Sequence, residues 1–172
     1  FEQPQPLVTT IGIATSIEIA DVNDDQRLDI FVEHRALESI ALYLQLEDGS
    51  FFRTDLPLNA NRPESLAVGD FNNDGFDDLA IGSPNEDLGG TFFRNAGIVE
   101  IVYGSVSGFT DHQRFHQYTP GVANKSEKND LFGSALAAGD FNNDGYDDLA
   151  IGVPGEGYSR GRSKAGTVHV LY

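Results

Sequence analysis

Short runs of alternating apolar and polar residues recur along the chain, and segments rich in Gly, Asn and Asp separate them. A period of two over about five to seven residues is typical of β-strands with one buried face. The runs fall into three groups that share one order, a strand, an acidic turn and a second strand, followed by further strands. The predicted strands cover 16–20, 28–34, 39–45 and 50–56, then 64–69, 78–82, 97–103 and 109–118, then 134–139, 148–152 and 166–172.

An internal repeat explains this grouping. The segment GDFNNDGFDDLAIG at 69–82 recurs at 139–152 with Tyr146 in place of Phe76, and a looser copy, ADVNDDQRLDIF, stands at 20–31. Antiparallel units of four strands, repeated along a chain, are typical of β-propeller blades. We therefore predict an all-β fold of four-stranded propeller blades, about three in this chain. Residues 1–172 form a single propeller segment, with blades at about 14–58, 59–119 and 130–172.

Oxygen-bearing side chains occupy positions 1, 3, 5 and 9 of each acidic turn, and position 7 can offer its backbone carbonyl. Calcium takes six to eight oxygens at about 2.3 to 2.6 Å and tolerates irregular geometry, whereas magnesium fits such a loop less well. Gly75 and Gly145 at position 6 allow a positive φ, although Gln26 stands there in the first copy. We predict three calcium ions per chain, bound by Asp21, Asn23, Asp25, Arg27 and Asp29, by Asp70, Asn72, Asp74, Phe76 and Asp78, and by Asp140, Asn142, Asp144, Tyr146 and Asp148.

An EF-hand or a dockerin-like loop would use similar ligands but would place a carboxylate at position 12 and continue into a helix. Position 12 is Val32, Ile81 or Ile151 in the three copies. The flanking residues are β-prone and lack a helical period over ten or more residues. Each loop is therefore predicted to join two strands.

Further residues around the repeats carry a family resemblance. Phe132-Gly133 precedes the third copy and Gly152-Val153-Pro154 ends it, while Gly82-Ser83-Pro84 ends the second copy and Arg62-Pro63 precedes it. The pattern resembles the FG-GAP repeats of integrin α-subunit propellers and related bacterial proteins, and the first copy resembles their degenerate repeats. The resemblance implies a non-catalytic module for extracellular adhesion or recognition, with structural calcium and with ligands on the face opposite the calcium hairpins.

Composition narrows the partners and the location. The net charge of -16 argues against nucleic acid and anionic membranes, and three calcium ions would reduce it to -10. Without cysteine there is no disulfide, so metal would supply the stabilising cross-link. No run approaches 18 apolar residues, which predicts no membrane insertion. Oxygen-rich loops of extracellular modules bind calcium at about 10⁻⁴ to 10⁻³ M, so we expect a secreted or cell-surface location.

Three blades are too few to close a propeller, which has about four blades at least. We expect this chain either to join the remaining blades of a longer propeller or to pair with a second copy as a homodimer. The segment 7–13 could supply the fourth strand of the last blade. Protein or glycan ligands would bind through the loops, among which the long link at 83–96 is the clearest candidate.

Three features suggest catalysis only weakly. The GxSxG match around Ser159 lacks the helix that a nucleophile elbow needs, and His112 and His116 are spaced by four in a segment without helical character. Identical repeated carboxylates also lack the asymmetry of a glycosidase acid and base. We predict no catalytic residue and no enzymatic activity. The alternative is the propeller part of a secreted carbohydrate- or lipid-active enzyme or a lectin, since related repeats accompany phospholipases and lyases.

Several residues near the loops have two interpretations. Asp77 and Asp147 follow ligand positions and could accept hydrogen bonds behind the ligands or face solvent, and for Asp24 we expect solvent. Like-charged short runs are usually solvated, so we expect an exposed loop for the basic residues Arg160, Arg162 and Lys164. Packing between blades is the expected role of five aromatic residues, with a binding surface as the alternative: Phe92, Phe93, Phe109, Phe115 and Tyr118.

Overall fold

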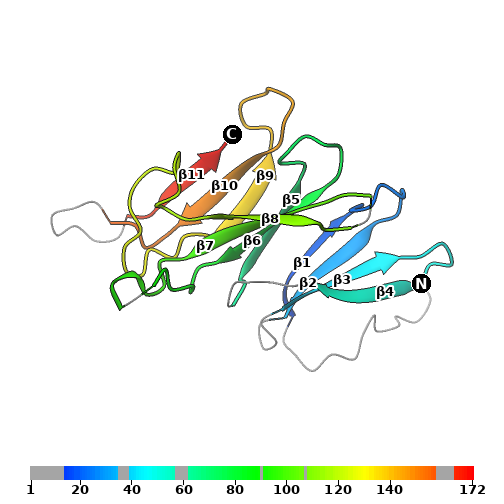
Figure 1. Cartoon of the computed structure of the whole chain (residues 1–172), viewed down its shortest axis with the longest axis horizontal. Helices are drawn as coiled ribbons and strands as arrows, with labels where there is room; N and C mark the ends of the chain where they lie inside the picture. The colour runs from blue at the N-terminus through cyan, green and yellow to red at the C-terminus, as the bar shows by residue number, and fades with distance from the viewer. Residues whose placement is uncertain (1–13, 35–38, 57–61, 90, 107, 158–164) are drawn as a thin grey trace.

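The structure is a computed structural model that describes residues 14–34, 39–56, 62–89, 91–106, 108–157 and 165–172. These residues form three antiparallel sheets that lie side by side in chain order (Figure 1). The first contains β1 (Ala14–Ala20), β2 (Asp29–His34), β3 (Ser39–Gln45) and β4 (Phe51–Leu56). The second contains β5 (Ser65–Gly69), β6 (Asp78–Ser83), β7 (Ile98–Tyr103) and β8 (Asp111–Phe115). In the described residues the third contains β9 (Ala135–Gly139), β10 (Asp148–Val153) and β11 (Thr167–Leu171).

The strands confirm the predicted all-β fold of propeller blades, and each overlaps a range predicted from the alternation. The fourth strand of the second sheet is shorter than predicted because the chain turns after Phe115. The Thr119 N–H donates to the His116 carbonyl at 2.8 Å, and the Val122 N–H donates to the Thr119 carbonyl at 3.0 Å. The link at 83–96 contains one short 3₁₀ turn, η1 (Thr91–Phe93).

The first strands of the three sheets lie next to one another, since β1 contacts β5 and β5 contacts β9 (Figure 1). One apolar core fills each junction between sheets. Phe31 and Leu42 of the first sheet share a core with Leu79 and Ile81 of the second. Burying each such side chain contributes about 1.5 to 3 kcal/mol. The second junction is equally apolar and contains Ala67, Ala80, Val99, Ile101, Phe132, Leu149, Ile151 and Val153.

The Phe132-Gly133 pair lies between the third sheet and the second. The Phe132 side chain is fully buried, and its N–H donates to the Ala96 carbonyl at 2.9 Å. The Gly133 carbonyl accepts a hydrogen bond from Ser65 Oγ at 2.7 Å. A Cβ on Gly82 would lie 2.1 Å from that same carbonyl oxygen, so only glycine permits this approach. The pair therefore anchors the third unit in the second.

Equivalent strands bury equivalent residues wherever a neighbouring sheet is present. Leu66 of β5 is 4% exposed because it packs in the core shared with the first sheet. Ile17 and Ile19, at the same register positions of β1 as Leu66 and Val68 of β5, are 61% and 58% exposed. On the side of the first sheet that faces away from the second sheet, β1 is therefore apolar and exposed, whereas Val32, Ala41 and Tyr43 on that side are buried.

Some sequence predictions lie outside the described residues. These are the 7–13 segment as a fourth strand, the serine of the GxSxG match and the basic residues Arg160, Arg162 and Lys164. Among the described residues, no helix has the length and apolarity needed to span a membrane.

Candidate calcium-binding loops

The three acidic turns are the hairpins that connect β1 to β2, β5 to β6 and β9 to β10. They lie along the same side of the row of sheets (Figure 1). A strand follows each hairpin, at Asp29, Asp78 and Asp148, so the prediction that each loop joins two strands is confirmed. The ligand side chains that the sequence predicts in each copy are thus held on one tight turn.

Within each turn the predicted ligand side chains accept backbone hydrogen bonds. In the second loop the Asp70 carboxylate accepts the N–H groups of Asp74 at 3.1 Å and Gly75 at 2.9 Å. Asn72 Oδ1 also accepts the Asp74 N–H at 2.9 Å, and Asp74 Oδ1 accepts the Phe76 N–H at 3.0 Å. The first and third loops repeat this pattern at 2.6 to 3.2 Å. These bonds turn the oxygens toward the inside of the loop.

Position 6 has a positive φ in all three loops, as predicted for the two glycines. The φ angles are 91° at Gly75, 94° at Gly145 and 66° at Gln26. A residue with a Cβ is uncommon in this left-handed region. The first loop therefore has the same turn as the other two even though it lacks the glycine.

The aspartate at position 9 is buried and connects the loop to the third strand of its sheet. Asp78 is 1% exposed, and its two oxygens accept the N–H groups of Phe71 and Gly104, each at 2.9 Å. Asp29 accepts the Val22 N–H at 3.3 Å and the Gln45 N–H at 2.8 Å. This carboxylate therefore holds the turn against the end of the third strand of its sheet.

Asp148 makes the first of these contacts and lacks the second. Its Oδ2 accepts the Phe141 N–H at 2.8 Å, whereas its buried Oδ1 has no hydrogen-bond partner among the described residues.

Burial makes the carboxylates of Asp78 and Asp29 difficult to ionise. Burial raises the pKa of Asp78 to about 6; the bonds from Gly104 and Phe71 lower it, while the charges of Asp74 and Asp70 raise it. Burial likewise raises the pKa of Asp29. A native pKa above that of the unfolded chain means that, without metal, stability falls as pH rises through the range from 3.8 to about 6. A cation in the loop would offset this cost.

The aspartate at position 8 contacts the loop of the preceding sheet. Asp147 Oδ2 accepts the Asp70 N–H at 3.1 Å, and Asp77 accepts the Asp21 N–H. A Cβ on Gly69 would lie 2.8 Å from Asp147 Oδ2, so this junction is close-packed. Of the two roles considered from sequence, Asp77 and Asp147 have the acceptor role. The sequence could not show that the donor lies in another unit.

Position 8 of the first loop is Leu28, which is 57% exposed, and Asp24 is exposed as predicted.

Two of the predicted aromatic residues, Phe109 and Phe115, pack against the cores between sheets. Phe93 contacts Tyr118 edge-on with ring centroids 5.7 Å apart, whereas Phe92 is 81% exposed. Packing between blades therefore accounts for some of the five aromatic residues.

The donor chemistry of the loops suits a hard cation. Each loop offers carboxylate, amide and carbonyl oxygens and no nitrogen or sulfur ligand, which is the set that calcium prefers. In the described part of the chain, however, no three His, Cys, Asp or Glu side chains converge as a ready-made metal site. The loop oxygens would have to move together around an ion.

Comparison with known proteins identifies the repeats. Residues 63–99 and 132–171 match the family model of the FG-GAP repeat. The chain is 29% identical over 154 residues to integrin alpha-PS3 of Drosophila melanogaster, covering 81% of the chain and 13% of the relative. It is 32% identical over 155 residues to integrin alpha-PS5 of the same species, covering 81% and 15%.

A second kind of relative is the phosphatidylinositol-glycan-specific phospholipase D of Rattus norvegicus. It is 38% identical over 108 residues, covering 62% of the chain and 12% of the relative. The chain thus spans 12 to 15% of the length of these three relatives. The matched residues include the second and third acidic turns and the Phe132-Gly133 pair. The chain is therefore an FG-GAP repeat protein, an integrin α-like propeller segment with its two matched repeats at 63–99 and 132–171.

Proposed function

We propose that this chain is a calcium-stabilised propeller module for extracellular adhesion or recognition, in which calcium is structural. The observation that carries the proposal is the recurrence of one oxygen-lined hairpin in all three sheets, with a buried aspartate behind it. A structural ion needs ligands on a turn that holds strands together, and these turns connect the first two strands of each sheet. Binding a metal to the folded chain alone would stabilise the fold.

The second and third loops have the strongest ligand sets. Calcium there would be held by the side chains at positions 1, 3, 5 and 9 and by the carbonyls of Phe76 and Tyr146. When bound in the second loop, it would supply positive charge beside the Asp78 carboxylate, which burial makes difficult to ionise. The sequence prediction of three ions also includes the first loop, which has the same turn but carries Arg27 at position 7.

Partners would bind away from the hairpins, on the long links between strands. The link at 83–96 and the segment 116–134 leave the sheets at the end opposite the acidic turns (Figure 1). They vary in sequence while the hairpins repeat. We assign recognition of a protein or glycan to these links, and we assign the two outer sides of the row of sheets to further blades or to a second copy. The integrin relatives and the calcium loops both favour an extracellular or cell-surface location.

A second candidate function is a propeller that forms part of a secreted carbohydrate- or lipid-active enzyme or a lectin. The similarity to a protein named as a phospholipase D supports it. Against a catalytic role for the hairpins, their carboxylates at positions 1 and 5 make the same backbone contacts in each copy. An acid and base pair requires two carboxylates in different environments.

Thermal unfolding in calcium, in magnesium and in a chelator tests the calcium role. Calcium at about 100 times its dissociation constant should stabilise the fold by about 2.7 kcal/mol for each site, with magnesium having a smaller effect. A variant that combines Asp70→Ala with Asp140→Ala should lose most of this gain, whereas Asp24→Ala, at an exposed position, should keep it. Equal melting temperatures in calcium and chelator would refute the proposal.

The enzyme alternative has its own assay. The chain is incubated with a phosphatidylinositol-glycan-anchored protein, with calcium present, and release of the protein is measured. The structural proposal predicts no release above that of buffer alone. Release that is lost on heating the chain would favour the enzyme.

A further inference from the structure

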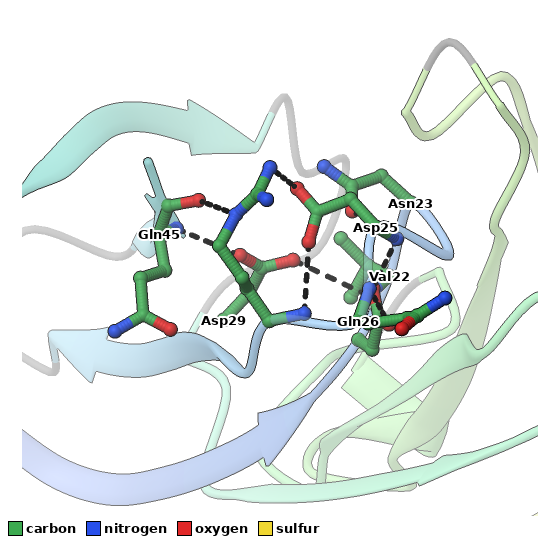
Figure 2. Close-up of polar contacts among 8 residues, drawn as sticks. Val22, Asn23, Asp25, Gln26, Asp29 and Gln45 are labelled. Carbon is green, nitrogen blue, oxygen red and sulfur yellow. Dashed lines mark hydrogen bonds and ion pairs between the residues drawn. The ribbon is translucent and has the colours of Figure 1, made fainter. Parts of the chain in front are cut away.

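The first loop contains a cation of its own, the guanidinium of Arg27. Figure 2 shows the loop residues Asp25, Gln26 and Asp29 together with Gln45 of β3. Its Nη2 lies 2.6 Å from Asp25 Oδ2, and the Arg27 backbone N–H donates to Asp25 Oδ1 at 2.9 Å. Both oxygens of this predicted ligand are therefore engaged by a single residue. Arginine stays protonated at any pH at which the protein is folded, so the charge on this side chain is permanent.

The same side chain also reaches the sheet. Arg27 Nε donates to the Gln45 carbonyl at 3.0 Å, while the Gln45 N–H donates to Asp29 Oδ1 at 2.8 Å. The end of β3 is thus connected to the hairpin twice, once through the guanidinium and once through the buried carboxylate. The guanidinium connects the turn to the third strand without any metal.

The other two loops place an aromatic residue at this position. Phe76 and Tyr146 carry no charge. Among the described residues, the Oδ2 atoms of Asp74 and Asp144 accept hydrogen bonds only from an asparagine amide, at 3.1 and 2.9 Å. A neutral amide can turn away when an ion arrives, because it donates a single exposed hydrogen bond. In those loops the ligand oxygens remain available.

We infer that Arg27 replaces the metal in the first loop, so that the chain binds two calcium ions, at 70–78 and 140–148, and none at 21–29. The inference rests on the proposed calcium role of the second and third loops. Its physical basis is charge: a dication in the first loop would have to approach a guanidinium that lies on one of its own ligands. The carboxylates at positions 1, 5 and 9 carry three negative charges in each loop, and Arg27 cancels one of them in the first.

Native mass spectrometry of the whole chain in calcium tests the count. We expect two ions for the wild type and three for Arg27→Phe, which places the aromatic residue of the second loop in the first. Phe76→Arg should reduce the count to one and weaken calcium binding at that loop at least tenfold. Arg53→Gln is the matched control, because Arg53 Nη2 pairs with Asp55 Oδ1 at 2.7 Å on exposed β4 with the same spacing of two residues. It should leave the count at two.

Melting in chelator tests the guanidinium bridge without calcium. Arg27→Phe should lower the melting temperature more than Arg53→Gln, because the Arg27 side chain connects a turn to the third strand of its sheet and the Arg53 side chain pairs with a residue of its own strand. Equal melting temperatures of the two variants would overturn the bridge. Three ions on the wild type, or two on both the wild type and Arg27→Phe, would overturn the replacement. No ion on the wild type would overturn the calcium proposal and the count of two with it.

Discussion

The hairpins at 21–29 and 70–78 have the same backbone and different charges. Both turns have a positive φ at positions 4 and 6, and both bury the aspartate at position 9. The first turn carries Gln26 and Arg27 where the second carries Gly75 and Phe76. The shape of the turn is therefore set by its hydrogen bonds to carboxylate and amide oxygens. The cation can then come either from solution or from the chain.

The largest expected effect comes from removing the buried aspartate. Asp29→Ala removes the acceptor of the Val22 and Gln45 N–H groups, and Asp78→Ala removes the acceptor of the Gly104 N–H and one of the two acceptors of the Phe71 N–H. Each substitution should cost about 2 to 5 kcal/mol in chelator. In calcium, Asp78→Ala should lose the stabilisation by the ion as well, whereas Asp29→Ala should lose no more than it does in chelator. Denaturant unfolding in the two buffers measures both values.

An equal response of these two variants to calcium would mean that the first and second loops use metal alike. The proposed difference between the two loops, metal in the second and Arg27 in the first, would then be wrong. Ser50→Ala serves as the control for hairpin substitutions, because its hydroxyl bonds only to exposed Asp48 in another turn of the first sheet. Its unfolding should respond to calcium as that of the wild type does.

A smaller effect is expected from the contact between neighbouring loops. Asp147→Asn weakens the acceptor for the Asp70 N–H across the junction, and should cost about 1 to 2 kcal/mol, since bonds to charged groups contribute about this much. Calcium affinity of the second loop should fall too, because Asp70 is a predicted ligand. Calorimetric titration measures the affinity. Asp24→Asn is exposed and should change neither value.

The smallest effects concern position 6. Gly75→Ala should destabilise the chain by about 1 to 2 kcal/mol, because a residue with a Cβ is strained at a φ of 91°. Gln26→Gly should relieve this strain and stabilise the chain by up to about 1 kcal/mol. The greater conformational entropy of glycine in the unfolded chain reduces this gain. Thermal melts in chelator compare the two. Destabilisation by Gln26→Gly would show that the Gln26 side chain contributes contacts of its own.

Much of the fold could be predicted because its signals are local. Alternation gives the strands directly, and a fourteen-residue duplicate gives the units. The fourth strand of the second sheet is shorter than predicted because the turn at 116–122 depends on backbone bonds that no alternation reveals. The insertion of Phe132 into the preceding unit is likewise a contact between distant segments.

In the candidate loops, too, local features could be predicted from the sequence and contacts between distant segments could not. Their positions and the inward oxygens follow from spacing, and the positive φ of Gly75 and Gly145 follows from residue type. The roles of Asp77 and Asp147 depend on where the neighbouring unit lies, which a pattern within one loop does not contain. For Arg27 the sequence suggested only a backbone carbonyl. Its side chain reaches Gln45, a residue 18 positions away, only when β2 and β3 pair.

The packing of β5 and β9 against the sheet before them has a consequence for the history of such chains. Each unit presents one apolar side to its predecessor and another to its successor, with Leu66 and Leu136 in equivalent places. After insertion or loss of an entire unit, each new junction between sheets would again pair two apolar sides of the same kind. The first two turns are 49 residues apart and the last two 70, and the extra residues lie in the links between strands. Units can therefore be duplicated and the links between strands can change in sequence and length while the packing between neighbouring sheets is kept.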